Sequence, residues 1–313
     1  MLKPKHAYIF PGQGAQSVGM GLELCKASNA AKEVFDEADA TLGFRLSRLI
    51  FEGPESELQD TVNSQPAIMT VSIACWRACQ ELLGAEMPMP VSVAGHSLGE
   101  YTSLVVSGVI SFSDAVKLVR ERGRLMKNAC EERPGGMAAI IGLDELAFEE
   151  ICQETGVELG NINADDQIVI SGDKLAVARA MDLACARGAR KAIPLPVSGA
   201  FHSSLMLNAQ QGLVRAMAQL DFADPGIPIV GNSNCRSLTT AAEVRGELTR
   251  GLCQCVRWKD SVRLMVDRGV SHFIEFGPSG VLTSLIKRID PTVSVVTLSD
   301  PISMKKMQQE FSS

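Results

Sequence analysis

A serine flanked by glycines joins a strand-like segment to a helix-like segment at residues 91–104, VSVAGHSLGEYTSL. The β-branched residues ahead of the serine favour a strand and residues 100–106 favour a helix, so the chain must turn sharply within GHSLG. A G-x-S-x-G turn in this context is typical of a nucleophile elbow, where small neighbours let a serine hydroxyl stand at a helix N-terminus. Ser97 is therefore the candidate nucleophile, and the competing interpretation is an ordinary loop.

Strand-like and helix-like segments alternate along most of the chain. The pattern predicts strands at residues 7–10, 90–94, 227–230 and 272–276, and helices at 22–40, 65–83 and 113–129. Ser113 is the predicted N-cap of the last of these helices. This alternation indicates an α/β fold with a mainly parallel sheet, and the elbow makes the core hydrolase-like.

The middle of the chain follows a different pattern. Strands are predicted at residues 137–142, 157–163, 168–171 and 189–195, and helices at 144–155 and 174–187. This β-α-β-β-α-β order is typical of a ferredoxin-like subdomain, and the prolines and glycines that border it indicate an insertion. We therefore expect a discontinuous hydrolase-like core at 1–129 and 197–313, and a ferredoxin-like small subdomain at 130–196.

Composition narrows the compartment and the class of partner. The net charge of −6 argues against nucleic acid, and no apolar run reaches the roughly 18 residues of a membrane span. The N-terminal residues lead into a predicted strand without a signal-peptide pattern, and nine cysteines without C-x-x-C spacing are typical of free thiols. Four scattered histidines offer no metal-ligand spacing. We expect a cytoplasmic protein without a metal, a membrane anchor or a nucleic-acid partner.

The general base for such a serine must be a carboxylate or one of the histidines at positions 6, 96, 202 and 272. His202 lies in the small-residue loop SGAFHSS at residues 198–204 and follows the serine in the chain, which is the order of α/β hydrolases. His96 neighbours the serine, but adjacent side chains at an elbow point apart. His202 is the preferred candidate, although spacing alone leaves the others open.

One face of the predicted helix at 113–129 carries an arginine among apolar residues. The positions on this face are Ala115, Leu118, Val119, Arg122, Leu125, Met126 and Ala129. Arg122 is either a partly buried guanidinium that binds an anion in bidentate fashion, or a structural arginine that reaches water or pairs with a carboxylate. If the anion is the substrate, the substrate is a carboxylate.

The segment GQGAQS at residues 12–17 follows the first predicted strand. It lacks the third glycine of a dinucleotide-binding loop, and no Gly-Lys-Ser/Thr follows it, so a nucleotide site is not expected. A tight turn at this place can instead bring a backbone N–H toward the serine as a second oxyanion donor.

Motifs along nearly the whole chain carry a family resemblance. They are FPGQGAQSVGMG at 10–21, SQPAIMTVS at 64–72, AGHSLGEYTSLV at 94–105, LVRERG at 118–123, GMAAIIGL at 136–143, NADDQIVISG at 163–172, LPVSGAFHSSLM at 195–206, VRWKDSV at 256–262 and FIEFGPSGVLTSLIKRI at 273–289. With them the chain resembles the malonyl-CoA:acyl-carrier-protein transacylases, acyltransferases of fatty acid and polyketide synthesis.

The resemblance implies a ping-pong reaction. Malonyl would pass from malonyl-CoA to Ser97, with His202 as base, and then to the phosphopantetheine thiol of holo acyl carrier protein. Arg122 would bind the free carboxylate of malonate, and residues 199–202, GAFH, look like the malonyl-selective form of the loop. Because a thiolate leaves readily, a Ser–His pair needs no third carboxylate. A monomer with no cofactor or metal of its own is expected.

Further site residues are assigned by the same resemblance. Backbone N–H groups of Gln13 and Leu98 would form the oxyanion hole, and Gln65 and Asn163 would line the site. The main-chain carbonyl of Gly251 would orient the histidine, at a position where relatives often carry glutamine. Glycine retains that carbonyl, so the role can survive the difference.

Other functions and contacts remain open. The alternatives are a free-standing acyltransferase of a polyketide synthase or malonate decarboxylase system, a serine esterase or thioesterase with water as acceptor, and a non-enzymatic carrier-binding scaffold. Acyl carrier proteins are acidic as a class, so the basic pairs Arg190-Lys191 and Lys287-Arg288 are candidate carrier contacts, with ordinary solvated charges as the competing interpretation.

Overall fold

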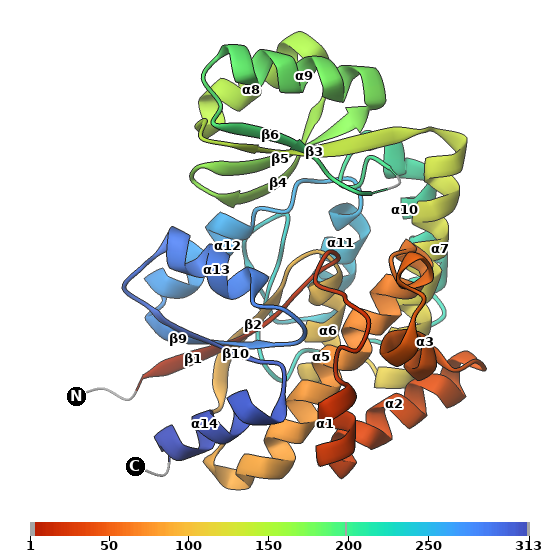
Figure 1. Ribbon diagram of the computed structural model, residues 1–313, viewed down its shortest axis with the longest axis vertical. Helices are drawn as coiled ribbons and strands as arrows, with labels where there is room; N and C mark the ends of the chain where they lie inside the picture. Colours follow the sequence, from red (N-terminus) through yellow and green to blue (C-terminus); the bar gives the residue numbers. More distant parts are fainter. Residues whose placement is uncertain (1–3, 198, 312–313) are drawn as a thin grey trace.

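The computed structural model describes residues 4–197 and 199–311, which form two sheets of different kinds (Figure 1). The larger sheet has six strands in the order β10-β9-β1-β2-β7-β8. Neighbouring strands from β10 to β7 are parallel, and β8 joins β7 in antiparallel fashion. Its strands are β1 (Lys5–Phe10), β2 (Pro90–Gly95), β7 (Ile229–Val230), β8 (Ser237–Leu238), β9 (Val270–Phe276) and β10 (Ser294–Leu298). The predicted α/β fold with a mainly parallel sheet is confirmed.

Strand β1 shows why helices cover both faces of this sheet. Successive side chains of a strand point to opposite faces, and β1 is apolar on both. Tyr8 and Phe10 belong to one hydrophobic cluster, while Ala7 and Ile9 belong to another on the opposite face. The first cluster contains α5 (Thr61–Leu83), α6 (Leu98–Val106) and α7 (Phe112–Glu132), and the second contains α12 (Trp258–Asp267) and α13 (Val281–Ile289).

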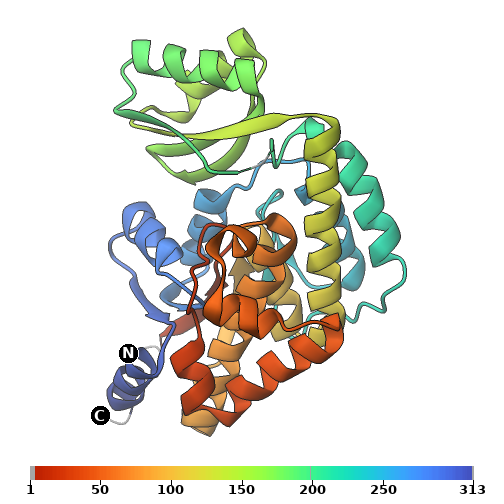
Figure 2. The same ribbon diagram turned by 45° about the vertical axis from the view of Figure 1, so that its right-hand side comes forward.

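The remaining core helices surround these layers. They are α1 (Leu22–Ala27), α2 (Asn29–Leu42), α3 (Leu46–Glu52), α4 (Glu55–Leu58), α10 (Leu207–Met217), α11 (Ala241–Gly251) and α14 (Pro301–Phe311). Figure 2 shows α7 rising along the edge of the core toward the smaller sheet, with α10 beside it. No helix within the described part of the chain is long and apolar enough to cross a membrane.

Two details of the predicted helices are wrong. The helix predicted at 22–40 is broken at Ser28, whose hydroxyl accepts the Ala31 N–H and so caps a new helix. Ser113 is not the N-cap of α7, because Ser111 accepts the Asp114 N–H at 3.1 Å. The Ser113 hydroxyl donates instead to Glu37.

The smaller sheet is antiparallel, with strand order β4-β5-β3-β6 and two helices on one face (Figure 1). Its elements are β3 (Gly135–Ile141), α8 (Glu145–Thr155), β4 (Glu158–Ala164), β5 (Gln167–Asp173), α9 (Lys174–Ala186) and β6 (Lys191–Pro194). They enclose a hydrophobic cluster of their own and have the predicted β-α-β-β-α-β order. The domain limits stay a prediction, and residues 1–3, 198 and 312–313 of the proposed ranges lie outside the described residues.

The small subdomain is fastened to the core along a seam next to α12. Val256 exchanges two backbone hydrogen bonds with β4, through Gly160 and Ile162, each 2.9 Å long. These bonds add a strand-like contact between the core and the edge of the smaller sheet. The position of β4 over the core is therefore set in part by backbone pairing.

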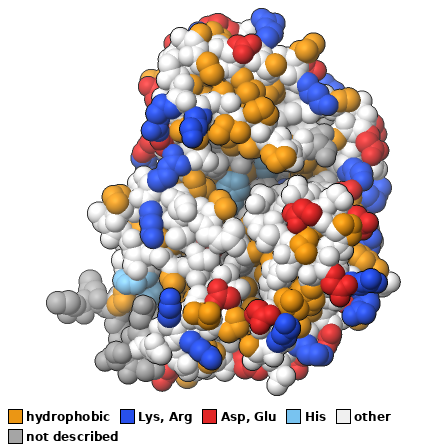
Figure 3. Space-filling model, viewed as in Figure 1, with side chains coloured by type: hydrophobic (Ala, Val, Ile, Leu, Met, Phe, Trp, Pro, Cys, Tyr) orange, Lys and Arg blue, Asp and Glu red, His pale blue; other side chains and the backbone are white. Residues whose placement is uncertain are grey.

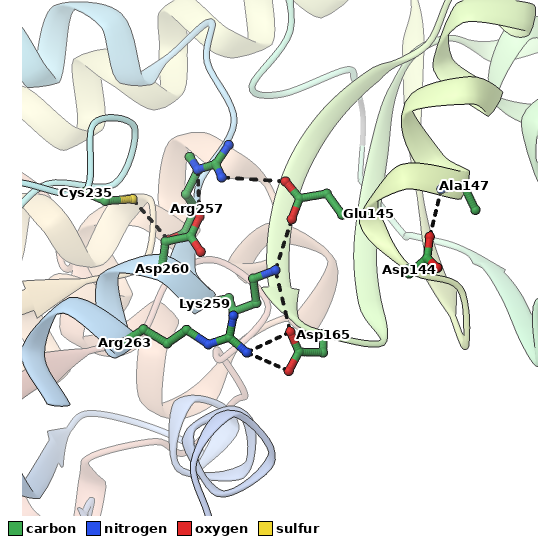
Figure 4. A network of polar contacts seen from close by, with 9 residues as sticks. All are labelled: Asp144, Glu145, Ala147, Asp165, Cys235, Arg257, Lys259, Asp260 and Arg263. Atoms are coloured by element: carbon green, nitrogen blue, oxygen red, sulfur yellow. Dashed lines mark hydrogen bonds and ion pairs between the residues drawn. The ribbon is translucent and has the colours of Figure 1, made fainter. Parts of the chain in front are cut away.

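Ion pairs extend the seam (Figure 4). Lys259 Nζ lies 3.0 Å from Glu145 Oε2 and 3.6 Å from Asp165 Oδ1. Arg263 contacts Asp165 at 2.8 Å, and Arg257 lies 3.6 Å from Glu145. Glu145 and Asp165 belong to the subdomain and the three cations to the core, so this network joins the two parts.

Candidate active site

The turn between β2 and α6 has the geometry of a nucleophile elbow. Ser97 adopts φ 50° and ψ −102°, a conformation that L residues rarely take, and α6 begins at Leu98. A Cβ atom on Gly95 would lie 1.9 Å from the carbonyl carbon of Gly99, and one on Gly99 would lie 2.0 Å from the Phe10 carbonyl oxygen. Both glycines are therefore required by close backbone approach, as the sequence predicts.

Ser97 and His202 meet although 105 positions separate them. Ser97 Oγ lies 2.8 Å from His202 Nε2, and His202 Nδ1 lies 2.8 Å from the carbonyl oxygen of Gly251. A carbonyl can only accept, so the ring proton sits on Nδ1 and the Nε2 lone pair faces the serine. Burial, followed by the charge of Arg122, lowers the pKa of His202 to about 3, which keeps the ring neutral and its Nε2 lone pair unprotonated.

Arg122 is a buried cation beside the serine. Its side chain is 3% exposed, so it does not reach water. Nη1 donates to Gln65 Oε1 at 2.6 Å, Nη2 lies 3.2 Å from Ser97 Oγ, and Nε is buried without a hydrogen-bond partner. The guanidinium carbon lies 5.2 Å from the ring centre of Tyr101. No carboxylate within residues 4–197 and 199–311 forms an ion pair with it; burial lowers its pKa, while Tyr101 and Glu100 favour its charged form.

A chain of polar contacts leads from Arg122 to the loop after β1. Gln65 Nε2 donates to Thr61 Oγ1 at 2.8 Å, and Thr61 donates to Gln13 Oε1 at 3.1 Å. The backbone N–H groups of Gln13 and Leu98 have no acceptor in the described part of the chain, so both are free to bind an oxyanion. The role of these two N–H groups as oxyanion donors stays a prediction.

The small subdomain supplies the opposite wall of the site. On β4, Asn163 Oδ1 lies 2.9 Å from His96 Nε2, and Asn161 Nδ2 lies 3.3 Å from the same atom. Asn161 Oδ1 is buried and has no hydrogen-bond partner. Asn161 was not predicted as a site residue, although side chains two positions apart on a strand share a face. His96 turns away from Ser97, as expected, and contacts the subdomain instead.

A cleft runs between the two walls. Its first part has a volume of about 260 Å³ and contains Ser97, His202, Met126, Met137, Val197 and Phe201 in its lining. A second part of about 240 Å³ shares Gln13, His96 and Asn161 with the first and extends to Val281 and Leu285 of α13. Figure 3 shows the hollow between the two lobes, with histidine visible inside it. The reactive pair therefore lies deep in an elongated cleft.

Two further residues near the elbow were not predicted from the sequence. Asn232 Oδ1 accepts the backbone N–H of Ser97 at 2.7 Å, and Glu100 Oε1 accepts the backbone N–H of Asn232 at 3.0 Å. The contact joins residues 135 positions apart, and no local motif marks it. Within the described residues, no group of three or more His, Cys, Asp or Glu side chains is arranged to hold a metal.

Known proteins resemble this chain over almost its full length. The acyl transferase domain family matches residues 7–309. Malonyl CoA-acyl carrier protein transacylase of Salmonella typhimurium is 44% identical over 302 residues, which cover 95% of this chain and 97% of that protein. The Bacillus subtilis protein of the same name is 43% identical over 95% of this chain and 94% of its own length.

Solved structures agree with these relatives. The acyl-carrier-protein-S-malonyltransferase from Bartonella henselae superposes with a TM-score of 0.94 at 37% identity, over 99% of this chain and 100% of that chain. A malonyl-transacylase solved in complex with its type II PKS acyl-carrier protein gives 0.94 at 40% identity, over 98% and 99% of the two chains. The chain therefore belongs to the acyl transferase domain family and, within it, to the malonyl CoA-acyl carrier protein transacylases.

Proposed function

We propose that this chain transfers the malonyl group of malonyl-CoA to the phosphopantetheine thiol of an acyl carrier protein, through an ester on Ser97, and so supplies fatty acid biosynthesis. The observation that carries the proposal is Arg122, a buried cation that forms no ion pair within the described residues and whose Nη2 lies 3.2 Å from Ser97 Oγ. A hydrolase for neutral esters has no use for such a group. A malonyl thioester places its free carboxylate a few bonds from the reacting carbonyl, where this cation can bind it.

The first half-reaction loads the enzyme. His202 Nε2 takes the proton of Ser97 Oγ as the oxygen attacks the thioester carbonyl carbon. The N–H groups of Gln13 and Leu98 stabilise the oxyanion that forms on the carbonyl oxygen. The C–S bond then breaks, and the proton on His202 passes to the departing coenzyme A sulfur. The products are a malonyl ester on Ser97 and free coenzyme A.

The second half-reaction reverses these steps with a different thiol. The carrier thiol gives its proton to His202, its sulfur attacks the ester carbonyl, and Ser97 Oγ leaves and regains the proton. The Gly251 carbonyl accepts Nδ1–H through both halves, and a glycine retains this main-chain acceptor. All proton transfers use Ser97, His202 and the two thiols. We therefore propose that the enzyme needs no metal or cofactor.

Two groups position the substrate in this proposal. Gln65 accepts from Arg122 Nη1 and fixes the plane of the guanidinium, so that its remaining donors face malonate. Asn163 lines the cleft from the subdomain side and holds His96. We further propose that the enzyme acts as a monomer, since one chain contains every protein group used in the reaction. We place it in the cytoplasm because its nine cysteines are free thiols, which suits a reducing compartment.

The proposed carrier contacts lie at the far end of the cleft. Arg190 and Arg288 both contact the carboxylate of Asp166, although they are distant in the sequence. Lys191 and Lys287 are exposed and form no ion pair within the described residues. Lys and Arg side chains gather on this edge of the molecule, between the subdomain and α13 (Figure 3). An acidic carrier docked here would direct its phosphopantetheine arm into the second part of the cleft.

Mass spectrometry of the intact protein tests the function. Enzyme mixed with malonyl-CoA alone should gain one malonyl group on the peptide that contains Ser97, and holo acyl carrier protein should remove it. Acetyl-CoA and methylmalonyl-CoA serve as matched donors, and carriers of fatty acid and polyketide pathways as matched acceptors. Release of free malonate as fast as transfer to the carrier would show that water is the acceptor and would replace this proposal with a thioesterase.

A further inference from the structure

The loop after β7 contains an asparagine whose every polar group is used. Asn232 is 2% exposed. Its side-chain Oδ1 accepts the Ser97 N–H at 2.7 Å, and its Nδ2 donates to the Gly95 carbonyl at 2.7 Å. Its backbone N–H donates to Glu100 at 3.0 Å, and its carbonyl accepts the Arg257 N–H at 2.8 Å. The two side-chain bonds lie on either side of His96, at the point where the elbow leaves the sheet.

This arrangement continues the β-ladder with a side chain. Strand β7 pairs in parallel with β2, and the pairing ends at Ala94 and Val230. In a parallel ladder, one residue donates to the carbonyl before its partner and accepts from the N–H after it. The Asn232 amide does the same across His96, because it donates to Gly95 and accepts from Ser97. The Ser97 N–H can only donate and the Gly95 carbonyl can only accept. Asn232 Oδ1 must therefore face Ser97, and its Nδ2 must face Gly95.

The elbow needs such a contact. Ser97 is held at φ 50°, a conformation that persists only when its surroundings enforce it. Its N–H lies at a helix N-terminus, where no helical carbonyl can accept it. Asn232 satisfies this donor and ties the residues before and after the turn to one planar group. Because Asn232 accepts the Ser97 N–H, that donor is not available to an oxyanion. The Leu98 N–H is the next donor along the chain and has no acceptor in the described residues.

We propose that Asn232 is a positioning residue of the transfer reaction. Its side-chain amide makes the two hydrogen bonds that a further strand residue would make, and so holds the strained Ser97 backbone in its reactive geometry. The inference rests on the proposed role of Ser97 as nucleophile. Removing the amide leaves Ser97 free to relax toward ordinary backbone angles, which moves Oγ relative to His202 and Arg122. Displacements of about 1 Å at reacting atoms can cost on the order of 100-fold in rate.

The first test compares a variant in the loop after β7 with a variant in α12 that contacts this loop. Asn232→Ala removes both elbow contacts, whereas Ser261→Ala removes a hydroxyl that donates to the neighbouring Gly231 carbonyl at 3.1 Å and does not touch the elbow. Asn232→Ala should lower the rate of Ser97 malonylation at saturating malonyl-CoA by roughly 10-fold to 100-fold, with little change in KM. Ser261→Ala should keep the wild-type rate. Equal rates for wild type and folded Asn232→Ala, or equal losses in both variants, would overturn the inference.

The second test uses Asn232→Asp, which keeps the shape of the side chain. A protonated carboxyl can accept from Ser97 and donate to Gly95, as the amide does, while a carboxylate would face the Gly95 carbonyl with a second acceptor. Malonylation by this variant should therefore accelerate as pH falls, and the wild-type rate should not. A variant with a wild-type pH profile would contradict the proposed donor to Gly95, and this result remains readable if Asn232→Ala does not fold.

Hydrogen exchange separates this inference from the proposed function. The Ser97 amide should exchange slowly in the wild type and at least 10-fold faster in Asn232→Ala, whatever reaction the enzyme performs, because the Oδ1 acceptor is lost. Failure of the wild type to form any malonyl adduct would refute the proposed function. Slow exchange of the Ser97 amide in Asn232→Ala would refute the proposal that Asn232 holds the Ser97 backbone.

Discussion

The two walls of the cleft are held in place by different forces. On the core wall, Ser97, His202 and Arg122 are linked by hydrogen bonds in a buried environment. On the subdomain wall, Asn161 and Asn163 sit on a sheet that the seam fastens to the core. The seam combines two backbone hydrogen bonds with ion pairs, in which the side chain of Asp165 is 60% exposed and that of Lys259 is 9% exposed. Salt and water weaken exposed charges far more than buried hydrogen bonds. Different substitutions should therefore change the catalytic geometry of the core wall and the position of the subdomain wall.

Substitutions on the core wall should have the largest effects. Ser97→Ala should abolish the malonyl adduct, because no other group forms the ester. His202→Ala should slow adduct formation by roughly 100-fold to 10,000-fold, the usual contribution of a general base. Quenched-flow mass spectrometry measures both. Asn161→Ala, on the opposite wall, is the matched control and should acylate at a nearly normal rate at saturating malonyl-CoA. A similar loss in that control would break the division between the walls.

The pH profile should report the buried state of His202. An exposed histidine with an ordinary pKa of 6.5 would lose about 90% of its basic form by pH 5.5. Because burial and Arg122 lower the pKa of His202 to about 3, kcat/KM should stay level between pH 7.5 and roughly pH 5.5. An acid limb centred near pH 6.5 would show that the ring is solvated in the working enzyme.

The same shift predicts acid sensitivity of the fold. Below about pH 6.5 the unfolded chain binds a proton at His202, while the folded protein does not bind it until about pH 3. Because the unfolded state binds more protons, His202 lowers the free energy of unfolding as the pH falls from about 6.5 to about 3. His202→Gln should reduce the dependence of urea unfolding on pH between 6.5 and 5. An unchanged slope would contradict the neutral buried ring.

Local patterns predict the core wall better than the rest of the molecule. The elbow at Ser97 and the arginine on the inner face of α7 follow from residues close together in sequence, because backbone turns and helical periodicity are local. Two other contacts depend on tertiary packing, which the spacing of residues in the sequence does not reveal. They are the hydrogen bond from Ser97 to Asn232 and the pairing of Arg190 and Arg288 with Asp166. The break at Ser28 has another cause. Apolar periodicity continues across it and so predicts one helix, whereas the extended backbone of Ser28 ends α1 and its hydroxyl caps α2.

Charge reversal near Asp166 should affect the carrier and spare the chemistry. Changing Lys191 and Lys287 to Glu should raise KM for holo acyl carrier protein several-fold at low salt, as expected for exposed charges that steer association. The rate of Ser97 malonylation by malonyl-CoA should stay within about twofold of wild type. The matched control reverses Lys26 and Lys32, which are exposed on α1 and α2. A carrier KM that does not change at low salt would place the docking surface elsewhere.

The smallest effect is expected at the seam. Asp165→Asn removes an exposed ion pair to Arg263, which contributes about 0.2–1 kcal/mol, and a 3.6 Å contact to Lys259, whose side chain is largely buried. Hydrogen exchange in β4 should accelerate by up to about fivefold, while peptides from the elbow should exchange as in the wild type. Equal acceleration at both places would mean that the two walls are held as one unit.

The most direct measurement compares two donors on one variant. Arg122→Ala removes the cation that, in this account, binds the malonyl carboxylate, and truncating one member of a buried charge pair costs on the order of 2–5 kcal/mol. We expect kcat/KM for malonyl-CoA to fall by roughly 30-fold or more, while slow transfer from acetyl-CoA falls little or rises. Arg124→Ala, on the exposed face of the same helix, should leave both unchanged. Equal losses for malonyl-CoA and acetyl-CoA in Arg122→Ala would contradict the account.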